Sequence, residues 1–489
     1  MSLSPVHFIA VPLLAAFLIP IIGRFSKEFV KIVPGIVFLY LSYVAISLFP
    51  VALNKPVVEV IAGWKPPFGI SLYYGPLAAF LTSLITLMGF VIWVYSYKFI
   101  IREPIEKYYM LFMLLITGST GIILTGDLFN MFVFLEITAI AAYSLTAFLR
   151  DRDGAEAAFK YLLIGSFASA FFLLAVMLIY SQVGTLNFAD IADKMNTVSY
   201  GTKILILIFF LVGLGIEAEV FPLNGWAPDA YSQAPSPIGA VFGGIVVKAS
   251  IYALMRIIFL FFNFNEVFHF LLIIGIITML IAEMSAMKQH QIKRMLAFSS
   301  IGQMGLVIIA FSVGTTDSVQ AGLFQMFNHA VIKAMLFFAA GYLVFHSGSK
   351  NISALDGLGR DKPVTSFFFA IGALAIMGLP PFSGFWSKLY ILLSVADAGL
   401  IAAVVLVLTA SVIEAVYYLR VVSRLYFNKE TASHSEVRRT PVSGLVAMGV
   451  LAVVIIVVGL YPDYLWHMLK PAAEELINKA AYIGNGLLK

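Results

Sequence analysis

The chain has 489 residues, of which 61% are hydrophobic and only 12% charged, and its mean hydropathy is +0.97. These values exclude a soluble globular protein and indicate a polytopic membrane protein, while the absence of cysteine excludes disulfides, thiolate metal sites and cysteine-held iron–sulfur clusters in this chain. The formal net charge of +5 does not indicate a nucleic-acid partner, because the basic residues are distributed over short loops between apolar segments.

Fourteen apolar segments predict membrane-spanning helices, since about 20 apolar residues are needed to cross a bilayer. The first segment follows no basic residues and shows no clear small-residue cleavage site, so we expect a retained helix rather than a signal peptide. The predicted spans are 6–23, 32–52, 74–97, 108–126, 128–149, 158–181, 203–232, 237–262, 267–287, 292–313, 318–345, 364–396, 400–427 and 441–462.

Two shorter elements are predicted between these spans. Residues 57–74 alternate β-prone pieces with Gly63, Pro66, Pro67 and Gly69, a pattern that predicts a surface hairpin. Residues 186–195 are too few to cross a bilayer, so we expect a surface helix there.

Basic residues are distributed unevenly between the two sides of the predicted membrane domain. Twenty of the 31 Lys and Arg residues lie in the loops after spans 1, 3, 5, 9, 11 and 13, whereas seven lie on the opposite side. This bias predicts that the basic loops face the cytoplasm and that both termini face outward. The twenty are Arg24, Lys27, Lys31, Lys98, Arg102, Lys107, Arg150, Arg152, Lys160, Lys288, Lys293, Arg294, Lys350, Arg360, Lys362, Arg420, Arg424, Lys429, Arg438 and Arg439.

Two of the spans are interrupted by proline and glycine. The seventh is broken at Pro222 and the twelfth at the GLPPFSG sequence of residues 378–384, five spans later. Broken helices at matching positions of two halves are typical of inverted-repeat transporters with sites near the midplane. We therefore predict an all-α polytopic membrane protein of about 14 helices with two inverted five-helix repeats. The predicted divisions are 1–107 (spans 1–3 with the hairpin), 108–262 (first repeat), 263–428 (second repeat) and 429–489 (last span and C-terminal tail).

Charged residues coincide with the first break. Residues 212–256 hold Glu217 and Glu219 before Pro222, a turn-rich segment, and then Lys248 in an apolar run. Because an ionised side chain inside a bilayer is tolerated only where protein or water surrounds it, this stretch predicts an ion-handling centre. A buried lysine can lose its charge and so carry protons, although a permanent ion pair of Lys248 with Glu136 or Glu217 is the alternative. Arg256 is closer to its helix end and is expected to snorkel.

Other ionisable residues also lie inside predicted spans. Glu136 is in the fifth span, where it costs several kcal/mol unless it is paired, hydrated or protonated, and a structural hydrogen-bonded carboxylate is the alternative. His329 and Lys333 are four residues apart and share one helical face, an arrangement suited to proton transfer, whereas a lone histidine would more often serve packing. Lys388 follows the second break and would be the last in this series of charged residues within the spans.

Glu283 and Glu414 are closer to span ends. They are weaker candidates, with exposure to solvent as the alternative.

Four sequence segments show a family resemblance. LTGDLFNMFVFLEI, FPLNGWAPDAYSQAPSPIGAVFGGIVVKASIYALMR, FNHAVIKAMLFFAAG and GLPPFSGFWSK resemble the antiporter-like subunits shared by Mrp-type cation/proton antiporters, respiratory complex I and membrane-bound hydrogenase-type complexes. The four occur in the family's order and cover spans 4 to 12. The resemblance implies a central proton or ion pathway made of Glu136, Lys248, His329, Lys333 and Lys388.

One position departs from the family pattern. Where the family usually has a lysine nine residues before the tryptophan of the broken seventh helix, this chain has Glu217. The usual Glu–Lys pair between spans five and seven is then impossible. Two carboxylates would instead face one cavity, and we include Glu217 in the predicted pathway.

The resulting functional hypothesis is a proton- or Na⁺/H⁺-translocating subunit of a multisubunit cell-membrane complex, driven by partner membrane subunits. The resemblance is closest to the D-type Mrp subunit and its archaeal hydrogenase-like relatives, and implies no cofactor, metal or catalytic centre in this chain. The alternative is a non-pumping structural subunit that links a redox module to other membrane modules, which Glu217 favours. An oxidoreductase catalytic subunit is disfavoured, since dinucleotide-binding and haem-attachment motifs are absent.

Overall fold

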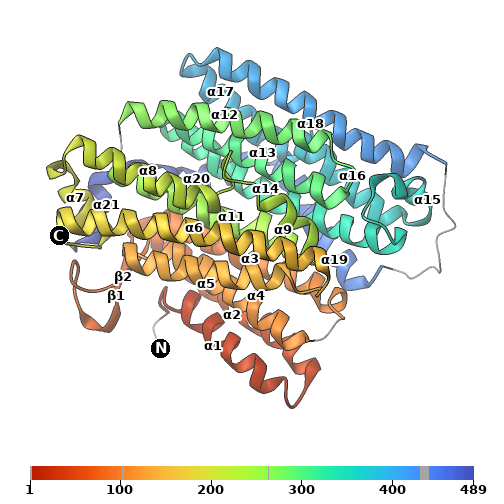
Figure 1. The fold of residues 1–489 in the computed structure, drawn as a ribbon, viewed down its shortest axis with the longest axis horizontal. Coiled ribbons are helices and arrows are strands. Elements are labelled where there is room, and N and C mark those ends of the chain that lie inside the picture. Colours follow the sequence, from red (N-terminus) through yellow and green to blue (C-terminus); the bar gives the residue numbers. More distant parts are fainter. Residues whose placement is uncertain (1–2, 102–103, 263, 430–439, 489) are drawn as a thin grey trace.

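The computed structural model describes residues 3–101, 104–262, 264–429 and 440–488, arranged as one helical bundle (Figure 1). Arg102, Arg438 and Arg439, which contribute to the predicted orientation, lie outside these residues. The first helices are α1 (His7–Ile22), α2 (Lys27–Asn54), α3 (Pro76–Phe99), α4 (Ile105–Leu124), α5 (Leu128–Thr146), α6 (Arg152–Val183), α7 (Phe188–Lys194), α8 (Tyr200–Glu217) and α9 (Ala227–Gln233). They are followed by α10 (Ser236–Val241), α11 (Val247–Phe261), α12 (Asn265–Met287), α13 (Ile292–Val313), α14 (Thr316–Ser347), α15 (Leu358–Asp361), α16 (Pro363–Met377), α17 (Ser383–Asp397), α18 (Ile401–Phe427), α19 (Val442–Leu460), α20 (Pro462–Ile477) and α21 (Lys479–Gly486).

Twelve helices in the described part of the chain are long and apolar enough to cross a membrane, and α1 and α16 are shorter apolar helices. All fourteen predicted spans overlap helices, the seventh being α8 with α9 and the twelfth α16 with α17. The prediction of an all-α membrane protein is therefore confirmed. The exact number of crossings and the inverted repeats stay predictions.

The two short elements also form. Strand β1 (Val57–Val60) pairs antiparallel with β2 (Ser71–Tyr74), so the predicted hairpin is confirmed. Helix α7 is present, but most of its residues are buried against α11 and α21, so its description as a surface helix was wrong. Figure 1 shows α7 and α21 together at one end of the bundle. Helices α20 and α21 were not predicted, because neither is an apolar segment long enough to cross a membrane.

The breaks have local backbone causes. Helix α8 ends at Glu217, and Glu219 has a φ of 61°, which stops the helical hydrogen-bond ladder before Pro222. Helix α16 ends at Gly378, whose φ of 85° is accessible to glycine at little steric cost. The eighth span contains a π-helical turn, Phe242–Val246, directly before Lys248. π-turns are rare and occur frequently at functional sites.

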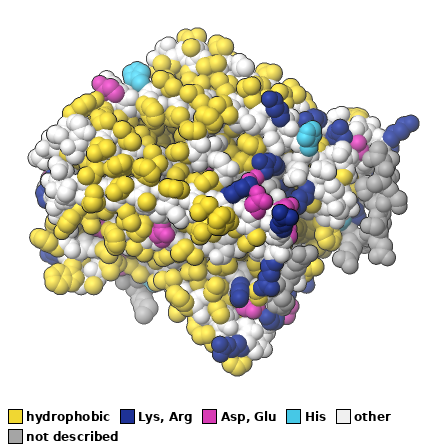
Figure 2. Space-filling model, in the orientation of Figure 1, with side chains coloured by type: hydrophobic (Ala, Val, Ile, Leu, Met, Phe, Trp, Pro, Cys, Tyr) yellow, Lys and Arg dark blue, Asp and Glu magenta, His cyan; other side chains and the backbone are white. Residues whose placement is uncertain are grey.

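The helices differ in how much of their surface is enclosed. The continuous span Ser236–Phe261 is buried throughout, and α13 and α14 are largely buried, whereas α6 and α18 expose one apolar side. Figure 2 shows hydrophobic side chains over most of one face, with charged side chains gathered toward one end. A continuous exposed apolar surface of this kind suits contact with lipid or with other membrane subunits.

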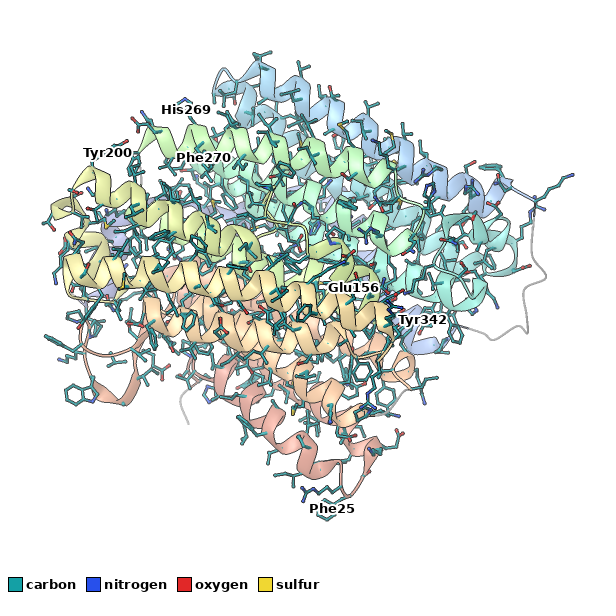
Figure 3. The ribbon with its side chains drawn as sticks, viewed as in Figure 1. Phe25, Glu156, Tyr200, His269, Phe270 and Tyr342 are labelled. Atoms are coloured by element: carbon teal, nitrogen blue, oxygen red, sulfur yellow. The ribbon has the colours of Figure 1, made fainter. Side chains whose placement is uncertain are left out.

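The sixth and seventh spans begin toward opposite ends of the bundle. Tyr200 at the start of α8 and His269 near the start of α12 lie at one end in Figure 3, whereas Glu156 near the start of α6 lies at the other. This alternation agrees with a chain that repeatedly crosses a membrane.

The expectation that Arg256 snorkels was wrong. Its side chain is 0% exposed, and its guanidinium donates to Glu475 of α20 at 2.5 Å. The guanidinium also lies 4.8 Å from the ring centroid of Tyr482 in α21. The C-terminal helices therefore enclose the end of α11, and an ion pair and a cation–π contact compensate the buried charge.

Candidate functional site

Lys248 and His329 form the centre of a buried polar network. The two side chains are 1% and 0% exposed. Nζ of Lys248 is hydrogen-bonded to Nδ1 of His329 and donates to the carbonyl of Gly243, five residues earlier in the π-turn. Lys248 forms no ion pair with Glu136 or Glu217, so the alternative of a permanent pair is wrong for this structure.

This contact defines the chemistry available to the two side chains. When Lys248 is the charged donor in this contact, His329 is a neutral imidazole whose proton is on Nε2. His329 Nε2 is buried and has no hydrogen-bond partner among the described residues. The proton can therefore reside on either the lysine amine or the imidazole, because no carboxylate among the described residues forms an ion pair with Lys248.

Lys333 lies one helical turn after His329 and contacts different helices. Its ammonium donates to the Leu296 carbonyl of α13 at 3.1 Å and to the Tyr418 hydroxyl of α18 at 3.0 Å. The Tyr418 hydroxyl also lies 3.0 Å from the hydroxyl of Ser299. The shared face of α14 thus presents His329 to α11 and Lys333 to α13 and α18.

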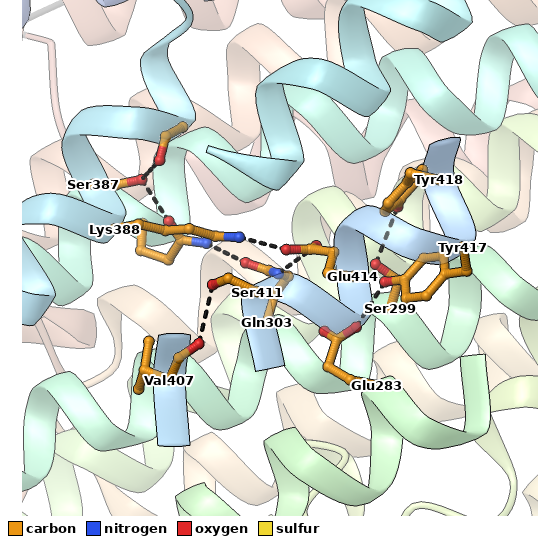
Figure 4. A network of polar contacts seen from close by, with 12 residues as sticks. Glu283, Ser299, Gln303, Ser387, Lys388, Val407, Ser411, Glu414, Tyr417 and Tyr418 are labelled. Atoms are coloured by element: carbon orange, nitrogen blue, oxygen red, sulfur yellow. Dashed lines mark hydrogen bonds and ion pairs between the residues drawn. The ribbon is translucent and has the colours of Figure 1, made fainter. Parts of the chain in front are cut away.

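Lys388 belongs to a second buried cluster (Figure 4). Its ammonium forms an ion pair with Glu414, which also accepts a hydrogen bond from Gln303 at 2.8 Å. Gln325 donates to Gln303 at 2.5 Å and accepts from Ser387 at 2.6 Å. Three helices, α13, α14 and α17, therefore orient the groups around the Glu414 carboxylate.

Glu283 completes this cluster. Its carboxylate accepts a hydrogen bond from the Tyr417 hydroxyl at 2.7 Å. Glu283, Lys388 and Glu414 line one cavity of about 10 Å³, about the space of one water molecule. Glu283 and Glu414 are both buried, so the alternative that they face solvent was wrong.

Glu136 and Glu217 face a separate small cavity, between α5, α6 and α8. Both residues line this space of about 10 Å³, and the Ser169 hydroxyl donates to Glu136. No basic residue among those described lines it. The expectation that two carboxylates face one cavity is therefore confirmed.

Several polar residues of the network were not predicted from sequence. Gln303, Gln325, Tyr417 and Tyr418 are uncharged and give little signal inside apolar segments. Glu219 is not part of the pathway predicted from sequence, although it is 1% exposed and lies in the break of the seventh span. Among the described residues, no group of three or more His, Asp or Glu side chains is arranged to hold a metal ion.

The fold and these clusters define a class of protein: a polytopic membrane protein whose apolar bundle encloses a series of ionisable side chains. Residues 125–414 match the family described as NADH:quinone oxidoreductase/Mrp antiporter, TM, and the chain belongs to this family.

Individual relatives agree with this assignment. The chain is 34% identical to NADH-quinone oxidoreductase subunit N of Desulforudis audaxviator, over 94% of this chain and 96% of the relative. It is 33% identical to the D-type subunit of the Na⁺/H⁺ antiporter of Alkalihalophilus pseudofirmus, over 82% and 83% of the two chains. Its fold is similar to a chain of the membrane-bound sulfane sulfur reductase, an archaeal respiratory membrane complex, with a TM-score of 0.93, 41% identity and coverage of 99% and 100%.

Proposed function

We propose that this chain is the proton- or Na⁺/H⁺-translocating subunit of a multisubunit membrane complex, and that Glu136, Glu217, Lys248, His329, Lys333 and Lys388 carry the ions. The observation that carries the proposal is the buried contact between Lys248 and His329. Burying a lysine without an anion in contact costs several kcal/mol, a cost that a purely structural residue would not need to incur.

Glu136 and Glu217 precede Lys248 in the sequence, and Lys388 follows His329. Glu136 and Glu217 belong to the first proposed repeat, 108–262, and Lys388 to the second, 263–428. Protons would move between them through the Lys248–His329 pair and Lys333. The energy would come from other membrane subunits, as the similarity to respiratory and antiporter complexes supports. The chain itself supplies no catalytic centre in this proposal.

We also propose where the chain is located and how it is oriented. It is a multi-pass protein of the cell membrane with both termini on the outer side, as the distribution of lysine and arginine supports. Residues 1–107 and 429–489 flank the two proposed repeats in the sequence.

A second function is favoured by one observation. The cavity of Glu136 and Glu217 has no lysine, unlike the Lys388 cluster. A chain whose first half is inactive would serve as a non-pumping structural subunit that links a redox module to other membrane modules.

Replacing Lys248 by Ala tests the main proposal. The assembled complex, reconstituted in vesicles, is expected to lose cation-coupled proton movement, because the lost group is a relay and not a packing residue. A pH-sensitive dye inside the vesicles measures this, and co-purifying subunits report assembly. Wild-type transport by the assembled variant would support the structural subunit instead.

A further inference from the structure

Glu219 is a buried carboxylate without a role in the pathway described above. It lies in the break between α8 and α9 and is 1% exposed. Its backbone has a φ of 61°, a conformation that non-glycine residues rarely adopt. Side chains held in such conformations are concentrated at functional sites.

Only one of its two carboxylate oxygens has a hydrogen-bond partner. The Tyr231 hydroxyl donates to Oε1 at 2.6 Å. Oε2 is buried and has no partner among the described residues. A structural acceptor for Tyr231 would need only one oxygen and no charge, and leaving a buried carboxylate oxygen without a hydrogen bond is destabilising.

The surroundings of Glu219 connect the two parts of the proposed pathway. The positive charges that act on it are those of Lys248 and Lys333, although no ion pair joins it to a described basic residue. On the other side, its charge acts on Glu217, together with that of Glu136. The remaining titratable groups around it are the hydroxyls of Tyr231 and Tyr161.

Tyr231 brings this carboxylate close to the lysines. A Cβ atom at Gly243 would lie 3.6 Å from the Tyr231 ring and 3.8 Å from Cβ of Lys333. The carbonyl of the same Gly243 accepts the Lys248 ammonium. Gly243 is therefore the point at which the Glu219–Tyr231 pair, Lys248 and Lys333 converge.

We propose that Glu219 is a further proton-carrying residue, which transfers protons between the Glu136–Glu217 cavity and the Lys248–His329 pair. In one step the protonated Glu217 loses its O–H bond and the Glu219 carboxylate gains one. In the next, Glu219 gives this proton to the neutral amine of Lys248, which becomes an ammonium. No electrons are exchanged, and Glu219 is returned to its carboxylate form.

This inference rests on the proposed function, and Glu219→Gln tests it separately. Glutamine keeps an oxygen to accept from Tyr231 but cannot carry a proton. We expect proton transport by the assembled complex in vesicles to fall at least about tenfold, equivalent to about 1.4 kcal/mol. The infrared difference spectrum on a pH step should lose one carboxylic-acid C=O band. The matched control is Asp190→Asn, which removes a buried carboxylate of α7 that pairs with Lys194 outside this network and should leave both signals unchanged.

Glu219→Asp provides a second measurement if Glu219→Gln does not assemble. It keeps the acid, so the same infrared band should move rather than disappear. Wild-type transport and an unchanged spectrum in Glu219→Gln, or an unmoved band in Glu219→Asp, would overturn the role of Glu219. If Lys248→Ala abolishes transport while Glu219→Gln does not, only this inference fails. If neither affects transport, the proposed function itself fails.

Discussion

The Glu136–Glu217 cavity and the Lys388–Glu414 cluster occupy the two proposed repeats and differ in charge. Each surrounds a space of about 10 Å³ and each contains two carboxylates, but only the second contains an ammonium. In the second cluster, Lys388 compensates one carboxylate and Tyr417 donates to the other. In the first, the Ser169 hydroxyl donates to Glu136, and no basic residue among those described lines the cavity.

This difference separates two ways of keeping carboxylates inside a membrane protein. Two like charges in a low dielectric resist joint ionisation, so a pair without a cation favours sharing one proton or binding one cation. A carboxylate paired with lysine can stay ionised. In the proposed pathway, the first cavity is therefore suited to taking up and releasing an ion, and the second to stabilising a charge that would arrive through Lys333.

The largest expected effect is that of Lys388→Ala. Removing one partner of a buried ion pair leaves Glu414 uncompensated beside Glu283, at a cost of about 3–5 kcal/mol. The assembled complex should unfold at a lower temperature in mild detergent, and transport should be lost. Lys388→Arg, which keeps the charge, should lose less of both. A variant as thermostable as the wild type would show that the ion pair is not needed to compensate Glu414.

Glu217→Lys should have a smaller effect on stability and a large one on ion dependence. The new ammonium would face Glu136 across the cavity and form the Glu–Lys pair that the family resemblance predicts. We expect Na⁺-dependent transport to be abolished or its pH profile to shift, because the acidic pair no longer exists. Glu217→Gln, which removes the charge without reversing it, is the control. Unchanged Na⁺ dependence and pH profile in Glu217→Lys would identify the first half as inactive.

The smallest effect is expected from serine substitutions at the two sites. Ser169→Ala removes a hydroxyl that donates to a carboxylate, a contact worth about 1.5–3 kcal/mol when the acceptor is charged. Ser387→Ala removes a hydroxyl that donates to the amide oxygen of Gln325, worth about 0.5–1.5 kcal/mol. Transport rates should therefore fall further in Ser169→Ala than in Ser387→Ala. The reverse order would show that the Glu136 carboxylate does not depend on this hydrogen bond.

Much of the architecture could be predicted because its signals are local. Bilayer thickness determines the length of an apolar span, and the proline and glycine residues that follow α8 and α16 indicate a break after each, so the helices and both breaks follow from short stretches of sequence. The hairpin of 57–74 and the family motifs are equally local. Most of the buried charged residues could also be predicted, because an ionisable residue is easily recognised within an apolar run of sequence.

The partner of each charge was decided only by the tertiary structure. Lys248 meets His329 rather than Glu136 or Glu217, and Arg256 meets Glu475 of a helix that the apolar pattern did not predict. These partners lie 81 and 219 residues apart in the chain. Periodicity specifies which face of a helix a residue occupies but not which helix packs against that face. The sequence by itself thus determined which ionisable residues lie in apolar segments, whereas helix packing decided which of them are buried and which are compensated by a partner.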